Sequence, residues 1–330
     1  MPSDKHNNVI QFPANDEAPA GGAAGERGDE AGAGKPNVAR AVVAQGKIQA
    51  AAIIGKDIIN EAIRLHDLLP LAAAALGRGL MGAVLLGLNL KDQDSLTLRI
   101  KGDGPLEGLL AQARPGGQVR GYVGNPGVEL PKNAQDKLDV GGAVGRNGFL
   151  YVTKDMGLKE PYTGTSALVS GEIAEDLAAY FLHSEQTPSV VSLGVLIDVD
   201  GSCLAAGGFL IKALPGADDQ TLAEMEHWLE VLPPVSALAM QLGDAAELLQ
   251  ALFPKEELQA LTLETWNFSC DCSRQRMEKA LISLGEQELK DILEEDGKSQ
   301  LRCNFCNNTF DFSANDLADL LAEAKKRSRT

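Results

Sequence analysis

The residues best suited to chemistry are four cysteines near the C-terminus, Cys270, Cys272, Cys303 and Cys306. They form a C-x-C pair and, after thirty intervening residues, a C-x-x-C pair. A C-x-x-C turn places two sulfurs around one ion, and a turn at Asp271 would let the C-x-C sulfurs face the same point. Four thiolates without a neighbouring histidine suit a closed tetrahedral zinc site, which is structural rather than catalytic. We therefore predict that these four residues bind one Zn2+ per reduced chain.

Two other interpretations of the C-x-x-C pair fit less well. A thioredoxin-like motif should begin a helix, and Asn307-Asn308 does not continue as one. A zinc deaminase carries an H-x-E sequence and a proline before its C-x-x-C pair. His183-Ser184-Glu185 has the first form, but no proline precedes Cys303. We interpret His183 as a surface or helix-end residue, and the fifth cysteine, Cys203, as part of a buried strand.

The C-terminal sequence contains elements that would hold the four cysteines in place. Two helical patterns lie between the pairs, the first ending at Gly285 and the second at Gly297. Cys303–Phe312 predicts a hairpin around a tight turn, followed by a short helix from about Asn315. In a domain of about 60 residues the apolar core contributes only a few kcal/mol to the free energy of folding, whereas structural zinc contributes roughly 10–16 kcal/mol. The metal would therefore decide whether this domain folds.

The same chemistry makes the site sensitive to oxidants. Zinc needs thiolates, and thiolates are also the groups that peroxide attacks. Oxidation to disulfides would remove the ligands, release the metal and unfold the domain. Five cysteines are too few for a disulfide framework, and four of them are clustered. These features predict a redox switch, which an adjoining helical segment that needs support would transmit.

The chain divides into four segments. Residues 1–37 are rich in Ala, Gly, Asp, Glu and Pro, with few large apolar residues, and predict a disordered extension. Residues 38–216 mix helix and strand patterns and predict an α+β core with antiparallel strands. Residues 217–266 predict a helical linker that needs something to pack on. Residues 267–330 hold the four cysteines and predict the zinc domain.

Several core elements follow from local patterns. A helix is expected within 45–69, with Ile58, Ile59 and Ala62 on its apolar side, and a buried helix over 71–88. Asp200-Gly201 predicts a two-residue hairpin turn between two strands. The Gly-rich segments 102–108 and 141–148 match neither the dinucleotide fingerprint nor the P-loop, so we interpret them as turns.

The linker has the periodicity of two or more helices. Leu222, Met225, Trp228, Leu229 and Leu232 recur at helical spacing and should form the apolar side of the first helix. Pro233-Pro234 stops that helix, and a second begins at about Val235. Asp244, followed by Glu247 three residues later, is a capping pattern that would restart the helix. The linker therefore has much apolar surface and little bulk of its own.

Composition restricts the class of protein. The chain has 330 residues, of which 44% are hydrophobic, as in soluble proteins with about two domains. Thirty basic and 46 acidic residues give a formal net charge of −16, which argues against broad, non-specific binding to nucleic acid. Charged residues interrupt the apolar stretches, and the N-terminal segment lacks the apolar region of a signal peptide. We therefore expect a cytoplasmic protein without a membrane partner.

Four motifs give the chain a resemblance to a known family. They are Glu160-Pro161-Tyr162-Thr163-Gly164, the run Ser170–Leu177, the run Ser184–Ser189 and the cysteine pattern that ends at Cys303-Asn304-Phe305-Cys306. Over about Val38 to Phe312 the sequence resembles the heat shock protein 33 family of redox-regulated chaperones. The extension before Val38 is not part of the usual pattern, and the resemblance implies nothing about it.

The resemblance implies an ATP-independent holdase with a metastable linker, inactive when reduced and zinc-bound. On that resemblance, oxidation pairs near neighbours, Cys270 with Cys272 and Cys303 with Cys306. The short gaps within each pair favour the same connectivity. Zinc would then leave, the linker would unfold, and the oxidised protein would form a homodimer that binds unfolding client proteins. Whether clients bind the core, the linker or both stays open at this point.

The main alternative is a zinc-ribbon protein that binds nucleic acid. Such a protein should carry a basic patch beside the cysteines, whereas acidic residues outnumber the nearby Arg274, Arg276, Lys279 and Arg302. No nucleophile–base pair or cofactor motif supports an enzyme. We therefore expect a chaperone without catalytic turnover and without a specific nucleic-acid partner.

Overall fold

The computed structural model describes residues 9–10, 35–218, 220–223, 229, 231–254 and 256–327. Contacts divide the chain into two compact units, one of residues 22–269 and one of residues 270–330 together with residues 1–21. Most of the predicted extension over residues 1–37 lies outside the described residues. Within it, Val9–Ile10 forms strand β1, which pairs in parallel with β13 (Lys298–Arg302).

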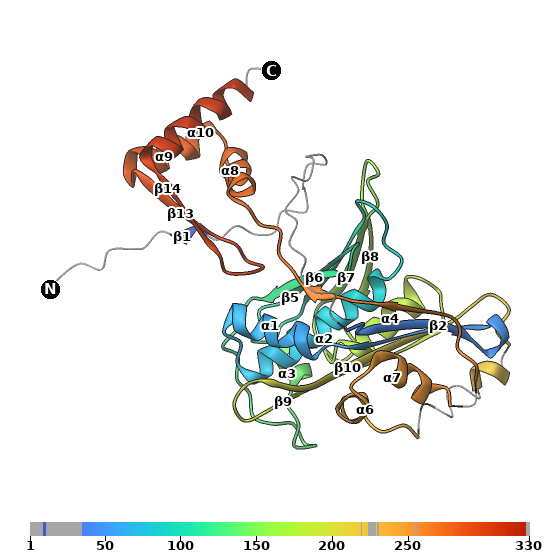
Figure 1. Cartoon of the computed structure of the whole chain (residues 1–330). Coiled ribbons are helices and arrows are strands. Elements are labelled where there is room, and N and C mark those ends of the chain that lie inside the picture. The colour runs from blue at the N-terminus through green and yellow to red at the C-terminus, as the bar shows by residue number, and fades with distance from the viewer. Residues whose placement is uncertain are drawn as a thin grey trace. The chain divides into compact units, whose positions relative to one another are not determined.

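The first unit is built on two sheets (Figure 1). The five-stranded sheet has the order β11 (Gln259–Glu264), β2 (Val38–Val43), β3 (Ile48–Ile54), β10 (Cys203–Ala213) and β9 (Ser189–Ile197). The six-stranded sheet has the order β12 (Asn267–Phe268), β6 (Gln118–Val123), β5 (Leu109–Arg114), β4 (Ser95–Lys101), β7 (Phe149–Asp155) and β8 (Tyr162–Ala167). All neighbouring strands in these sheets are antiparallel except β12 and β6. The predicted α+β class with antiparallel strands is confirmed.

Helix α2 (Pro70–Gly87) is the centre of the main core. It contacts β9 and β10 of one sheet and β4, β5 and β6 of the other. By length and composition it could cross a membrane, but 83% of it is buried inside the protein, which identifies it as a core helix. Helix α1 (Lys56–His66) packs beside it through Ile58, Ile59 and Ala62. Both helices predicted from the sequence are confirmed.

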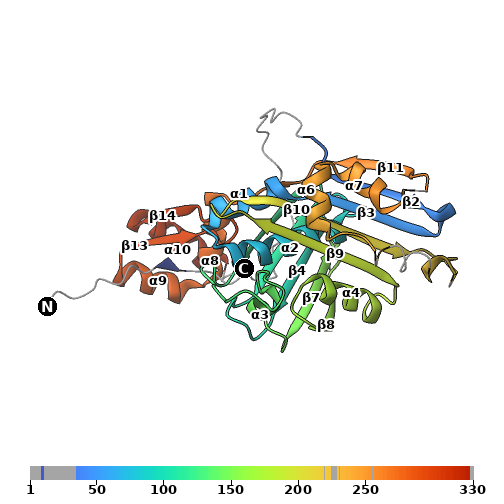
Figure 2. The same ribbon diagram turned by 90° about the horizontal axis from the view of Figure 1, so that it is seen from below.

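Two short helices of the linker cover the opposite face of the five-stranded sheet (Figures 1 and 2). Helix α6 (Val235–Leu242) contacts β9 and β10, and α7 (Ala245–Leu252) contacts β2 and β3. The Asp244 carboxylate caps α7 by accepting from the N–H groups of Ala246 and Glu247, at 2.8 and 3.2 Å. The restart predicted at Asp244 is therefore correct. Of the first predicted linker helix, Met225 and Trp228 lie outside the described residues.

The end of the linker is extended rather than helical. Residues 259–264 form β11, which pairs with β2, and residues 267–268 form β12. Between them Trp266 is buried in the main core, with 2% of its surface exposed. Its backbone N–H donates to Asn37 Oδ1 at 2.8 Å, and its carbonyl accepts from Asn37 Nδ2 at 2.9 Å. The last residues of the predicted linker, 259–266, therefore belong to the five-stranded sheet and the main core, where the sequence predicted a helical segment, and β12 follows directly after them.

The hairpin between β9 and β10 also differs from the prediction. Its strands end at Ile197 and begin again at Cys203, so the loop is Asp198–Ser202 and not the two residues Asp200-Gly201. The Asp198 N–H donates to the Ser202 carbonyl at 2.8 Å and closes the wider loop. A register shift between Cys203 and Ala205 bends the strand as it leaves this loop.

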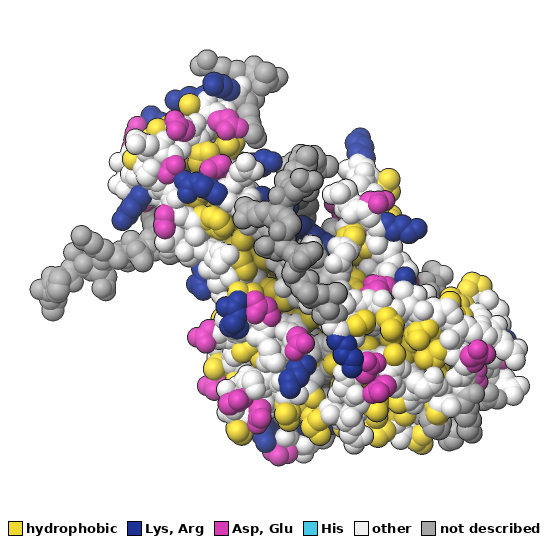
Figure 3. Space-filling view, viewed as in Figure 1, with side chains coloured by type: hydrophobic (Ala, Val, Ile, Leu, Met, Phe, Trp, Pro, Cys, Tyr) yellow, Lys and Arg dark blue, Asp and Glu magenta, His cyan; other side chains and the backbone are white. Residues whose placement is uncertain are grey.

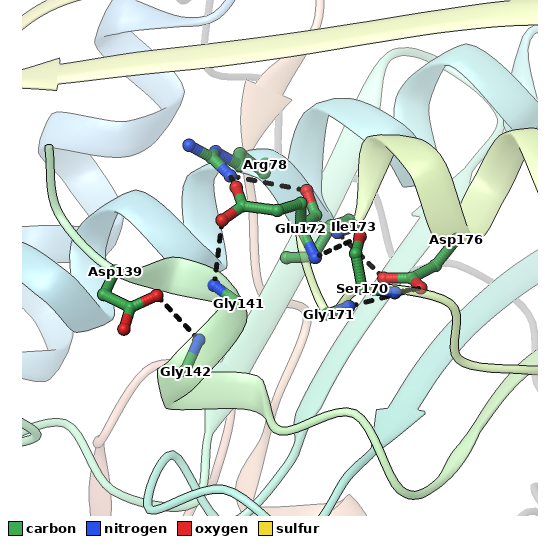
Figure 4. A network of polar contacts seen from close by, with 9 residues as sticks. All are labelled: Arg78, Asp139, Gly141, Gly142, Ser170, Gly171, Glu172, Ile173 and Asp176. Atoms are coloured by element: carbon green, nitrogen blue, oxygen red, sulfur yellow. Dashed lines mark hydrogen bonds and ion pairs between the residues drawn. The ribbon is translucent and has the colours of Figure 1, made fainter. Parts of the chain in front are cut away.

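The Gly-rich segment 102–108 forms a loop, as predicted, whereas residues 141–144 of the other segment belong to the short helix α3 (Val140–Val144) and only residues 145–148 are a loop. Beside α3 the loop before α4 (Ala174–His183) is fixed by a buried carboxylate (Figure 4). Asp176 Oδ1 accepts from the N–H groups of Val169, Ser170 and Gly171, and Oδ2 accepts from that of Ile173, at distances from 2.7 to 3.3 Å. The carboxylate thus satisfies four backbone donors and also lies at the positive end of α4.

Replacing this carboxylate should destabilise the core strongly. Asp176 is fully buried, so Asp176→Ala would leave four backbone N–H groups without their acceptor. An orphaned buried donor costs about 1–3 kcal/mol, and we expect the free energy of unfolding to fall by at least about 3 kcal/mol. Urea unfolding of the purified chain measures it. Glu175→Ala, which removes the exposed neighbouring carboxylate, is the matched control and should cost less than about 1 kcal/mol. Equal effects of the two variants would contradict this account.

Candidate metal centre

Two of the four cysteines lie in the hairpin loop between β13 and β14 (Thr309–Ser313). The Cys303 N–H donates to the Asn308 carbonyl at 2.9 Å, and the Asn307 N–H donates to the Cys303 carbonyl at 2.8 Å. Asn307 adopts a left-handed conformation, which its short polar side chain tolerates. These bonds fold the loop tightly, so that Cys303 and Cys306 lie on one side of it. A hairpin is present here, but its bounds differ from the predicted Cys303–Phe312: the first strand is Lys298–Arg302, before the first of these cysteines, and residues 303–308 form the loop.

The other two cysteines lie in the irregular segment just before α8 (Arg274–Ser283). Ser273 caps this helix by accepting from the Arg276 N–H at 3.3 Å. The Arg276 guanidinium also forms an ion pair with the carboxylate of Asp271, between Cys270 and Cys272. The cap and the ion pair hold this segment against the start of α8. Ser273 and Arg276 lie outside the cysteine pattern, so the pattern does not predict these two contacts.

The structure brings all four sulfurs together, within 4.8 Å of one another. The Sγ atoms of Cys270 and Cys303 are 3.7 Å apart, and those of Cys272 and Cys306 are 3.3 Å apart. Zinc–sulfur bonds of about 2.3 Å in a tetrahedron place sulfurs about 3.8 Å apart. Cys303 and Cys306 are buried, while the other two are partly buried. The four side chains therefore have the number, type and spacing that a tetrahedral metal site requires.

The electrostatics of the cluster require a cation if the cysteines are to ionise. The hydrogen bond with Cys270 and burial raise the pKa of the Cys303 thiol. Burial, followed by the contact with Cys306, raises the pKa of Cys272 to about 12. Four adjacent thiolates would repel one another, and a divalent cation among them removes that penalty. Sulfur donors select soft ions, so the residues present could hold a metal ion of the zinc type.

The unit that carries this cluster has a small core. Helices α8, α9 (Glu286–Glu295) and α10 (Ala314–Arg327) pack around β13 and β14. Its buried side chains are Leu281, Ile282, Leu289, Leu301, Phe312, Leu317, Leu320, Leu321 and Ala324. A core of this size stabilises a fold of about 60 residues by only a few kcal/mol. The helix predicted as short from Asn315 is longer, with 14 residues from Ala314.

The remaining sequence predictions can be placed on the structure. Cys203 lies in the other unit, buried at the start of β10, and burial raises the pKa of its thiol to about 11. His183 is the exposed last residue of α4, as expected. Arg274 and Arg276 form ion pairs with acidic neighbours, and basic and acidic side chains are interspersed over this unit in Figure 3. This arrangement does not favour the nucleic-acid alternative.

Comparisons with known proteins agree with the resemblance drawn from the motifs. The family described as "Hsp33 protein" matches residues 37–313. A "33 kDa chaperonin" of Clostridium beijerinckii is 42% identical over 88% of this chain and 100% of its own length. A protein of the same name from Halalkalibacterium halodurans is 43% identical over 85% of this chain and 96% of its own.

A solved structure supports the same assignment. The crystal structure of a 33 kDa chaperonin from Thermotoga maritima has a TM-score of 0.81 and 36% sequence identity to this chain. The match covers 88% of this chain and 99% of that one. The fold, the cysteine cluster and these matches together show that the chain belongs to the Hsp33 family of chaperones.

Proposed function

We propose that this protein is a redox-regulated, ATP-independent holdase that prevents unfolding proteins from aggregating during oxidative stress. In the reduced state Cys270, Cys272, Cys303 and Cys306 would hold one Zn2+, and the chaperone would be inactive. The observation that carries the proposal is the cluster of four sulfurs within 4.8 Å in a unit with a small core. Such a unit depends on its metal for folding, so the redox state of its thiols decides whether it is folded.

Oxidation would act directly on the sulfurs. For each disulfide, two thiolates give up two electrons to one peroxide molecule, which takes up two protons and leaves as two waters. We propose the pairs Cys270–Cys272 and Cys303–Cys306, because each partner is the nearest in sequence. In a tetrahedral site all sulfurs are about equally close, so the contacts between Cys270 and Cys303 and between Cys272 and Cys306 do not argue against this pairing. Sulfurs in disulfides no longer bind the cation.

The linker would convert loss of the metal into exposed apolar surface. Helices α6 and α7 have eight residues each, which is too short for stability in isolation. They bury Leu248, Leu249 and Leu252 against the face of the five-stranded sheet. If they detach, both their own apolar side and the sheet beneath become available. Burial of each such side chain contributes roughly 1.5–3 kcal/mol, so a few suffice to bind an unfolding client or a second subunit.

Aggregation assays test the function directly. We expect the full chain, oxidised with peroxide, to suppress aggregation of a thermally unfolding client without ATP, while the reduced, zinc-loaded chain does not. Thiol reductant together with zinc should restore the inactive state. Peptide mapping of the same oxidised sample reports the pairing. Equal suppression by reduced and oxidised protein would refute redox regulation, and disulfides mainly between the two cysteine pairs would refute the connectivity.

A further inference from the structure

The four cysteines come from two separate parts of the C-terminal unit. Cys270 and Cys272 lie just before α8, and Cys303 and Cys306 lie in the hairpin loop between β13 and β14. A tetrahedral site requires that these two parts stay in place relative to each other. A direct contact between them, independent of the metal, would therefore decide how easily the set of ligands comes apart.

Arg274, the first residue of α8, makes such a contact. Its Nη1 donates to the carbonyl oxygen of Asp311 in β14 at 2.8 Å, and its Nη2 lies 2.9 Å from Asp316 Oδ1 in the first turn of α10. The guanidinium also lies over the ring of Phe312, 4.5 Å from the ring centroid. A further ion pair, with Glu278 at 3.3 Å, stays within α8. We call the contacts of Arg274 with β14 and α10 the clasp.

The groups that receive Arg274 are themselves held in place. Asp316 Oδ2 accepts from the backbone N–H and the hydroxyl of Ser313, at 2.8 and 2.7 Å, and the Asp316 N–H donates back to Ser313 Oγ at 3.3 Å. This reciprocal capping of α10 leaves Asp316 Oδ1 to the arginine. Phe312 is part of the small core, with 1% of its surface exposed. The clasp is therefore anchored on groups whose positions the fold determines.

The position of the clasp in the unit gives it a consequence for the metal centre. Arg274 follows Cys272 by two residues, whereas the buried residues of α8, Leu281 and Ile282, lie at the other end of that helix. On the hairpin side the clasp holds β14, whose partner β13 leads directly into the loop of Cys303. The clasp therefore acts close to the sulfurs, at the end of α8 that the core holds least.

We propose that Arg274 is a positioning residue of the metal centre, which holds the segment of Cys270 and Cys272 against the hairpin and thereby sets how readily the thiols give up their metal. This inference rests on the proposed function, because it needs zinc in the reduced chain. A thiolate that leaves the metal returns quickly while it stays beside the site, and the clasp keeps it there. Without the clasp the segment moves away, and a chelator or an oxidant competes more effectively for the open positions.

Transfer of zinc from the reduced full chain to a chromogenic chelator tests this role. Arg274→Met removes the guanidinium and keeps an apolar side chain over Phe312. It should leave zinc bound at the start and speed its transfer at least about tenfold. Glu278→Gln is the matched control, because its ion pair with Arg274 lies within α8, and it should change the rate by less than about twofold. Equal rates for Arg274→Met and the wild-type chain would overturn the inference, as would an equal effect of Glu278→Gln.

The geometry of the clasp also distinguishes arginine from lysine. Arg274→Lys keeps the positive charge but has one nitrogen in place of the two that contact Asp311 and Asp316. We therefore expect zinc transfer from Arg274→Lys to be nearly as fast as from Arg274→Met. A wild-type rate in Arg274→Lys would show that charge alone suffices and would contradict the clasp.

The partner of the arginine provides an independent test, which still decides the question if Arg274→Met does not hold zinc. Asp316→Asn removes the ion pair with Arg274 and keeps an oxygen that can cap α10 at Ser313. It should speed zinc transfer at least about threefold, and the double variant should be no faster than Arg274→Met, since both substitutions break one contact. An unchanged rate in Asp316→Asn, or effects that multiply in the double variant, would count against the inference.

Amide hydrogen exchange separates positioning from a general loss of stability. In the zinc-loaded chain Arg274→Met should lower protection in residues 270–276 and leave α9 unchanged. Leu293→Ala, which truncates a partly buried leucine of α9 in the same unit, should lower protection in α9 and change zinc transfer by less than about threefold. If zinc transfer follows the protection of α9 in both variants, Arg274 acts through stability alone and the inference fails.

Zinc analysis of the reduced wild-type chain separates this inference from the proposed function. Less than half an equivalent of zinc, with all thiols reduced, would refute the metal site, and the inference would fail with it. If the wild-type chain holds one equivalent but transfers it as fast as Arg274→Met does, the role of Arg274 is wrong and the proposed function stands.

Discussion

Replacement of Cys303 by serine should abolish tight zinc binding and unfold the C-terminal unit of the reduced chain. Three thiolates leave the tetrahedral site open to water, and a serine hydroxyl does not replace a thiolate as a ligand at neutral pH. Structural zinc contributes roughly 10–16 kcal/mol in small domains, more than a core of about nine buried side chains supplies. We expect one equivalent of zinc in the reduced wild-type chain and less than half an equivalent in Cys303→Ser.

The consequence for folding can be measured on the same samples. Far-UV circular dichroism should show loss of the helical signal of α8, α9 and α10 in Cys303→Ser, and Cys306→Ser should behave alike. Cys203→Ala is the matched control, since it removes a buried thiol from the other unit and should leave the zinc content unchanged. A full equivalent of zinc in Cys303→Ser, resistant to a competing chelator, would show that the four cysteines are not the ligand set.

The proximity of the four cysteines could be predicted from the sequence because their signal is local and chemical. Cys303 and Cys306 occupy a tight loop whose geometry follows from their spacing. If both cysteine pairs bind the same ion, all four sulfurs must lie close together, as they do. The ion pair between Asp271 and Arg276 was not predictable in this way. It depends on how the segment before α8 turns, and charged residues three to five apart occur throughout this acidic chain.

The fold was predictable where burial is recorded in the apolar residues of the sequence. Helix α1 has one buried side and shows a helical period, whereas α2 is buried nearly all round and shows a long apolar run. Strand β11 carries only a short alternation, Leu261 and Leu263 against Thr262 and Glu264, within a segment whose other apolar residues recur at helical spacing. Both leucines are about half exposed, and the strand is held by its backbone ladder to β2, so its pairing depends more on hydrogen bonds than on the burial that a sequence pattern records.

The structure leads us to expect that the end of the linker responds to oxidation differently from α6 and α7. Arg40 of β2 forms an ion pair with Glu264 at 3.2 Å, and Trp266 is buried in the main core. The N–H groups of Asn267 and Ser269 donate to the carbonyls of Gly117 and Val119, at 2.8 and 2.9 Å. Removing a buried tryptophan from a core costs about 3–5 kcal/mol, and the hydrogen bonds add to that cost. This segment should therefore stay in place when α6 and α7 detach.

Upon oxidation, hydrogen exchange should thus distinguish two parts of the segment 235–269, which spans most of the predicted linker and the three residues that follow it. We expect amides in residues 235–252 to lose at least about 100-fold in protection, which corresponds to a loss of about 3 kcal/mol in opening free energy. Amides in residues 259–269 should keep most of theirs, together with the core strands β3 and β10. Mass spectrometry of peptic fragments from the reduced and oxidised full chain measures both parts in one experiment.

A variant separates opening of the linker from oxidation of the cysteines. Leu248 of α7 is fully buried between this helix and the five-stranded sheet, and truncating a buried leucine costs about 2–5 kcal/mol. Leu248→Ala should therefore raise amide hydrogen exchange in residues 235–252 of the reduced chain while zinc stays bound. Without oxidant, this variant should also suppress part of the aggregation of client proteins. The matched control is Leu261→Ala, which truncates an exposed leucine of β11.

If residues 235–252 of the wild-type chain remain equally protected from hydrogen exchange after oxidation, the linker does not open and the proposed switch is wrong. If residues 259–269 lose protection in parallel with them, the buried Trp266 does not limit the opening, and the whole segment unfolds as one unit.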